Sequence, residues 1–204
     1  MLFFISVSGC DTKADVTFLL DNSDNVGQQN FQKQLSFVRD VTSNMQLASD
    51  KMQVSAVTFG TGATNQFDLN QYRTMAGLQN ATMSIPYKGG KAQLANAIHY
   101  VTGSTFSPVH GGRGDAPHIA VVITNQPSGT IDSVKLQSQT AKDNGVILYT
   151  IGVGTAVDNK ELMTIASDPD SRHMFTSQNF DALGSLSDLL ATKICNGKYL
   201  FSLS

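Results

Sequence analysis

Short apolar runs that end in glycine or a small polar residue recur along the chain and predict buried strands. These runs cover residues 16–20, 54–59, 118–124 and 146–151. Runs of this length, without alternation of apolar and polar positions, are typical of central strands that are covered on both faces. Two shorter segments, residues 66–69 and 173–175, predict further strands, and we place the first of them at an edge of the sheet.

Between these runs, apolar residues recur every three or four positions and predict helices. The clearest case is residues 27–47, where Phe31, Leu35, Val38 and Met45 recur at helical spacing. Further helices are predicted over residues 72–79, 92–101, 131–144, 161–166 and 182–194. Repeated alternation of strand and helix predicts an α/β fold, with a mostly parallel sheet and helices on both faces.

Composition restricts the classes of partner. The chain has 204 residues, of which 41% are hydrophobic and 15% charged, and its net charge is −2. This length predicts one domain. Because there is no basic run, we expect neither nucleic acid nor an anionic membrane as a partner. No segment is long and apolar enough to span a bilayer.

The two ends of the chain indicate secretion. Residues 1–9 are apolar and then small, which is typical of the end of a signal peptide. Cys10 and Cys195 flank the first strand and the last helix, and we expect them to form a disulfide because domain termini commonly lie close together. Such a bridge indicates an oxidising compartment. Asn80 begins an acceptor sequence for N-glycosylation. The domain is therefore expected over residues 10–195, with 196–204 as a tail or linker stub.

The turn after the first strand has the side chains of a cation site. Asp21 ends the strand, and Ser23 and Asn25 follow at alternate positions. Short oxygen-bearing side chains at the carboxyl end of a parallel strand lie where α/β sheets place ligands. A simpler interpretation is that Asp21 and Ser23 cap the helix that begins near Val26.

Three strand motifs, in order and at matching spacing, resemble a von Willebrand factor type A domain. They are Asp-Val-Thr-Phe-Leu-Leu-Asp at 15–21, Ala-Pro-His-Ile-Ala-Val-Val-Ile-Thr-Asn at 116–125 and Leu-Tyr-Thr-Ile-Gly-Val-Gly at 148–154. The resemblance covers about residues 15–194. It implies a Rossmann-like, doubly wound sheet with a metal-ion-dependent adhesion site at its carboxyl edge, where Mg²⁺ or Ca²⁺ holds a partner's carboxylate.

This chain departs from the family's ligand set at three positions. Asp21 and Ser23 match the opening Asp-x-Ser-x-Ser pattern, but Asn25 replaces its last serine. Ala92 stands at the family's ligating threonine, and Asn125 at its second aspartate. Because carboxylate count tunes affinity for such cations, the resemblance implies a degenerate site that binds Mg²⁺ or Ca²⁺ weakly or not at all.

The same turns predict a partner-binding edge. We place Asp24, Lys91, Ala92 and Gln126 on it, beside the degenerate metal ligands. A separate hypothesis concerns the tripeptide Arg113-Gly114-Asp115, an integrin-recognition motif in a glycine-rich loop.

The leading hypothesis from the resemblance is a secreted binding module of the extracellular matrix, whose partner is collagen or another matrix protein. The alternative is a structural spacer or self-assembly unit that has no ligand site. An α/β enzyme using Asp21 ranks last, because Asn125 is a poor second catalytic group and no Gly-x-Ser-x-Gly elbow is present. We therefore expect a protein that is not an enzyme.

Overall fold

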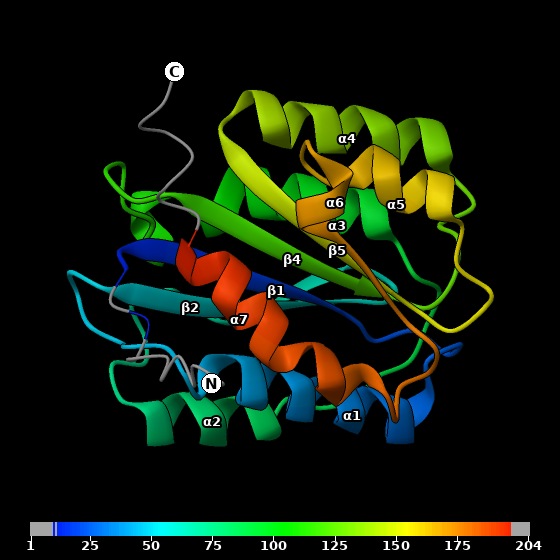
Figure 1. Ribbon diagram of the computed structural model, residues 1–204. Coiled ribbons are helices and arrows are strands. Elements are labelled where there is room, and N and C mark those ends of the chain that lie inside the picture. Colours follow the sequence, from blue (N-terminus) through cyan, green and yellow to red (C-terminus); the bar gives the residue numbers. More distant parts are fainter. Residues whose placement is uncertain (1–9, 11, 197–204) are drawn as a thin grey trace, which may run out of the picture.

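Six strands form one sheet in the computed structural model, which describes residues 10 and 12–196 (Figure 1). The strands are β1 (Ala14–Asp21), β2 (Met52–Phe59), β3 (Ala63–Phe67), β4 (His118–Thr124), β5 (Val146–Val153) and β6 (Met174–Ser177). Their order is β3-β2-β1-β4-β5-β6, and every pairing is parallel except that of β2 with β3. The predicted α/β, doubly wound and mostly parallel sheet is confirmed.

Helices cover both faces of this sheet (Figure 1). One layer contains α1 (Gly27–Thr42), α2 (Met75–Met83) and α7 (Ser187–Asn196), and the other contains α3 (Leu94–Tyr100), α4 (Ile131–Asp143) and α5 (Asn159–Ile165). A π-helical stretch (Val101–Thr105) extends α3, and the one-turn helix α6 (Asp170–His173) precedes β6. Short 3-10 turns cover Pro108–His110 and Leu183–Leu186. Among the described residues, no helix is long and apolar enough to cross a membrane.

The core has two halves because successive side chains of a strand point to opposite faces. Phe18 and Leu20 of β1 are fully buried on the side of α1 and α7. Leu19, between them, is fully buried on the side of α3 and α4. β1 therefore lies at the centre of the molecule, and its carboxyl end is held by packing on both faces.

Several element boundaries differ from the sequence-based prediction, and two of the differences have a clear physical reason. The helix predicted over 27–47 ends at Thr42, because Met45 pairs with Cys10 in an isolated bridge and buries its side chain from an extended segment. The edge strand predicted over 66–69 is β3, which begins three residues earlier. Its first four residues are only half-buried, so the strand has no apolar run to mark it.

Cys10 and Cys195 form a disulfide, as predicted, with their Cα atoms 5.4 Å apart. The bridge joins the segment before β1 to the end of α7. The predicted signal remnant at 1–9 lies outside the described residues, as does the predicted tail beyond Asn196.

Candidate functional site

The carboxyl ends of β1 and β4 place the candidate ligand residues side by side. The two strands are parallel neighbours, with Leu20 opposite Ile123. Asp21 is the last residue of β1, and Asn125 follows the last residue of β4. Residues far apart in the sequence therefore meet at one edge of the sheet, as the strand-end argument predicted.

Asp21 is fully buried at this edge. Its Oδ1 accepts a hydrogen bond of 3.0 Å from the backbone N–H of Ser23, and its Oδ2 accepts one of 3.3 Å from the Thr124 hydroxyl. Burial raises the pKa of Asp21, because desolvation disfavours the carboxylate. The Ser23 side chain, the Ser23 N–H and the Thr124 hydroxyl lower the pKa, but not enough to cancel this effect.

Two buried oxygens beside Asp21 make no hydrogen bond of ordinary geometry among the described residues: Ser23 Oγ, whose hydroxyl still lies close enough to Asp21 to lower its pKa, and Asn125 Oδ1. The amide nitrogen of Asn125 donates to the backbone carbonyl of Asn25 at 3.1 Å, so the bonding capacity of its oxygen remains unused. Buried polar atoms are almost always paired, and the exceptions call for a physical reason. A ligand that donates hydrogen bonds at this edge would supply one.

Hydrogen bonds between loops hold the edge in shape. Asp24 exchanges two of them with Gly90, each about 2.8–2.9 Å: its backbone N–H donates to the Gly90 carbonyl, and its Oδ1 accepts from the Gly90 N–H. Asn25 Nδ2 donates to Gln126 Oε1. Lys91 is exposed and Ala92 is half-buried on the same loop as Gly90. The predicted edge residues thus belong to three adjoining loops.

Sequence reasoning missed three residues that support this edge. Asn22 is buried and bridges two loops, because its Oδ1 accepts from the Lys88 N–H and its Nδ2 donates to the Pro86 carbonyl. Thr124 binds Asp21, as described above. Glu161 of α5 is buried, and its carboxylate accepts from both the N–H and the hydroxyl of Ser128, so it anchors the loop that follows Asn125. The sequence contained only a weak signal for Asn22 and Thr124, namely a polar residue at or beside a strand end. It contained no signal for Glu161.

The capping interpretation of Asp21 and Ser23 is wrong. Helix α1 begins at Gly27 after Val26, and no side chain caps it. Ser23 instead accepts from the N–H groups of Val26 and Gly27 through its backbone carbonyl, at 3.1 and 3.4 Å. The Asp21 carboxylate accepts a hydrogen bond from the N–H of Ser23, two residues later, and this bond stabilises the local turn rather than the helix.

The side chains at this edge fit a divalent cation poorly. Asp21 is the one buried carboxylate among the candidate ligand positions, and the exposed Asp24 carboxylate is turned towards the Gly90 N–H. Ala92 offers no side-chain oxygen. Within the described ranges, no group of three or more His, Cys, Asp or Glu residues is placed to hold a metal ion. Mg²⁺ demands several oxygen ligands in octahedral geometry, so the edge retains oxygens of such a site but little of its charge.

The Arg113-Gly114-Asp115 tripeptide lies at the opposite, amino edge of the sheet. Asp15 of β1 is fully buried, and Arg113 binds it with a 2.8 Å hydrogen bond from Nε and a 2.6 Å contact from Nη2. Nη1 also donates to the backbone carbonyl of Ser49, and Nη2 to those of Ala14 and Lys51, each at 2.8 Å. Gly114 and Asp115 are exposed, and Asp115 pairs with Lys13. Integrin adhesion stays a prediction, and a guanidinium held this way does not favour it.

Asn80 is exposed on α2, so the predicted glycosylation acceptor lies on the surface. The hydroxyl of Thr82, the third residue of the acceptor sequence, is buried. Glycosylation of Asn80 stays a prediction.

Replacing Asp21 with asparagine should stabilise the fold at pH 7. The raised pKa of Asp21 means that the folded protein favours the protonated carboxyl more than the unfolded chain does. The contribution of Asp21 to stability is therefore fully present below the ordinary pKa of 3.8 and is lost as the pH rises through the higher folded-state value. Urea unfolding at pH 7 should therefore show the Asp21→Asn variant to be more stable than the parent, and at pH 3 the gain should shrink. A variant less stable at pH 7 would show that hydrogen bonds to the carboxylate outweigh its desolvation.

Comparison with known proteins gives a consistent group of relatives. A family model described as von Willebrand factor type A domain matches residues 15–189. The collagen alpha-1(XII) chain of Notophthalmus viridescens is 31% identical over 189 residues, which cover 92% of this chain and 20% of that protein. Matrilin-1 of Gallus gallus is 28% identical over 187 residues, covering 92% of this chain and 37% of that protein.

A solved structure of similar fold is that of proximal thread matrix protein 1 from the mussel byssus with a zinc-occupied MIDAS motif. Its TM-score is 0.82 at 23% identity, over 92% of this chain and 49% of that chain. This chain therefore spans less than half the length of each of these three proteins.

Proposed function

Because the chain belongs to the von Willebrand factor type A domain family, we propose that it is a secreted, non-enzymatic binding module of the extracellular matrix. Its partner is collagen or another matrix protein, which docks on the carboxyl edge of the sheet. The observation that carries this proposal is the pair of buried, unpartnered oxygens, Ser23 Oγ and Asn125 Oδ1, beside the Asp21 carboxylate. The carboxylate and the amide oxygen accept hydrogen bonds, and the Ser23 hydroxyl can accept as well as donate, so donors on a partner could bond to all three.

The relatives and the disulfide support the setting. The matched proteins are named as a collagen, a matrilin and a byssal thread matrix protein. A disulfide between Cys10 and Cys195 fits an oxidising compartment. We place the domain over residues 10–195.

We further propose that the metal site is degenerate. Zinc occupies the MIDAS motif of the mussel protein. In this chain one buried carboxylate and two neutral oxygens would hold Mg²⁺ or Ca²⁺ only weakly, because ligand charge sets much of the affinity. Recognition would then rest on hydrogen bonds rather than on a bond between a metal and a partner's carboxylate.

Partner binding should therefore survive a chelator, whereas a repaired site should make it metal-dependent. The test is binding to immobilised collagen with EDTA and with added Mg²⁺. We expect the parent chain to bind equally in both, within about twofold. The variant Ala92→Thr/Asn125→Asp restores the family's threonine and aspartate, and its Mg²⁺ affinity should rise at least about tenfold by calorimetry.

Gln126→Glu is the matched control for the Mg²⁺ titration only, since it adds a charge to the same edge outside the ligand positions, and it should leave Mg²⁺ affinity near that of the parent. Complete loss of parent binding in EDTA, restored by Mg²⁺, would overturn the degenerate site. Unchanged collagen binding by a folded Asp21→Ala/Asn125→Ala variant would overturn the proposed binding edge and favour the structural spacer.

A further inference from the structure

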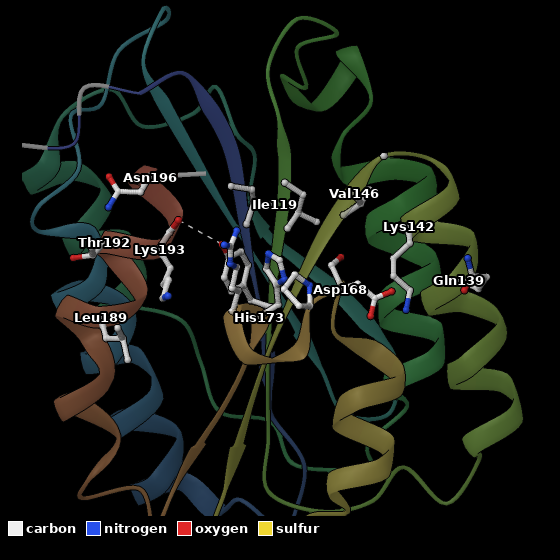
Figure 2. Close-up of a pocket in the computed structure, with 16 residues that line it drawn as sticks. Ile119, Gln139, Lys142, Val146, Asp168, His173, Leu189, Thr192, Lys193 and Asn196 are labelled. Atoms are coloured by element: carbon white, nitrogen blue, oxygen red, sulfur yellow. Dashed lines mark hydrogen bonds between the residues drawn. The ribbon is translucent and has the colours of Figure 1, made fainter. Parts of the chain in front are cut away.

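A cavity of about 1150 Å³ opens at the amino edge of the sheet, opposite the Asp21 edge. Ile119 near the start of β4 and Val146 and Ile147 at the start of β5 contribute to its lining. Figure 2 shows α7 with Leu189 on one side, α4 on the other, and the α6 turn with His173 between them. Ile119, Val146, Ile147 and Leu189 give the cavity an apolar part. The cavity is large enough for a small molecule, since ligand pockets commonly measure about 300–1,000 Å³.

The charge around this cavity is mostly positive. Lys142, Arg172 and Lys193 line it, with Asp168 as the one carboxylate among the lining residues. The Lys142 ammonium donates to the carbonyls of Thr164 and Ala166 at 3.0 and 3.2 Å. Within the described part of the chain, neither the Arg172 nor the Lys193 side chain has a hydrogen bond or an ion pair. Two cations are therefore available to a ligand.

The lining of this cavity also includes a buried polar atom that the described residues leave without a partner. His173 is 8% exposed, its ring packs edge-on against Tyr149 at 4.7 Å, and its Nδ1 is buried with no hydrogen-bond partner among the described residues. Burial is the main cause that lowers the pKa of His173. The backbone of Ser167 and of Pro169 raises this pKa through hydrogen bonds, and the charges of Arg172 and Lys193 lower it. The unpartnered Nδ1 can share a hydrogen bond with a ligand headgroup.

We propose that this cavity binds an amphiphilic anion of the long-chain carboxylate class. The apolar lining of Ile119, Val146 and Leu189 would take the hydrocarbon chain. The carboxylate would lie between Arg172 and Lys193, where charge-assisted hydrogen bonds replace their contact with water. The site is independent of the partner-binding edge and does not rest on the function proposed for that edge.

Calorimetric titration of the full chain with dodecanoate, below its micellar concentration, tests the proposal. We expect saturable binding at one site. Charge-assisted hydrogen bonds stabilise a complex more than neutral ones do. The variant Arg172→Gln/Lys193→Gln should therefore lower the affinity for dodecanoate by about tenfold or more. Dodecylamine has the same hydrocarbon chain and the opposite charge. Its affinity for the parent chain should be at least about tenfold lower than that of dodecanoate.

Two further variants separate this site from general surfactant binding. Lys135→Gln/Lys160→Gln removes the same charge outside the cavity and should leave dodecanoate affinity unchanged. Thr192→Trp fills the cavity from an exposed position on α7 and should abolish binding without unfolding the chain. Absence of saturable binding, equal affinity for dodecylamine, or equal weakening by the two charge variants would overturn the proposal.

Discussion

Replacing Arg113 with alanine is expected to lower the free energy of unfolding by about 3–5 kcal/mol, because it removes the guanidinium that pairs with a buried charge. The backbone N–H of residue 113 and the His118 ring, 3.7 Å away, would remain beside that charge. Asp15 is fully buried and Arg113 supplies its nearest cation, at 2.6 Å. Three backbone carbonyls would also lose their donors. Urea denaturation followed by far-ultraviolet circular dichroism measures the loss.

Lys33→Ala is the matched control, since Lys33 pairs with Asp181 at an exposed site. Exposed pairs contribute only about 0–1 kcal/mol, so this variant should barely change the unfolding midpoint. The loss of unfolding free energy for Arg113→Lys should lie between those of the other two variants, because one ammonium group cannot donate to the carboxylate and to all three carbonyls as the planar guanidinium does. A loss below about 1 kcal/mol for Arg113→Ala would contradict the structural role assigned to this ion pair.

Removing the disulfide should have the other large effect. The bridge closes a separation of 185 residues, and the chain-entropy model gives a stabilisation of about 5 kcal/mol for a loop of that size. Since whole domains are stable by about 5–15 kcal/mol, Cys10→Ser/Cys195→Ser should be partly unfolded at 37 °C. The measurement is the urea midpoint of the double variant against the oxidised parent.

The parent after reduction by dithiothreitol is the internal control, and its midpoint should fall by the same amount as that of the double variant. Agreement between the two would show that the loss comes from the covalent link rather than from the serine side chains. A double variant as stable as the oxidised parent would show that the denatured chain gains little freedom when the bridge is absent.

The strands and their order of appearance could be predicted because a buried parallel strand requires a continuous apolar run. This is visible at β4, whose predicted and observed bounds coincide. β3 was less predictable, since Ala63, Thr64 and Asn65 pair with β2 through their backbones while their side chains remain partly exposed. Backbone pairing at an edge leaves little trace in the pattern of side chains.

The site was predictable to the extent that topology determines it. Asp21 and Asn125 end neighbouring parallel strands, so an α/β pattern already brings them together. The two unpartnered oxygens and the binding of Thr124 to Asp21 depend on side-chain directions, which spacing does not encode. The role of Arg113 was hidden for a similar reason, because its partner Asp15 lies 98 residues away, near the start of β1.

The bridge between Cys10 and Cys195 also determines how the domain carries mechanical load. A tension applied outside these two residues passes through one covalent bond between Cα atoms 5.4 Å apart. The force then bypasses the residues between them, and both of the surfaces proposed for binding keep their shape while the chain outside the bridge is stretched. In a fibre under tension, the domain would therefore bear no load and would not extend by unfolding.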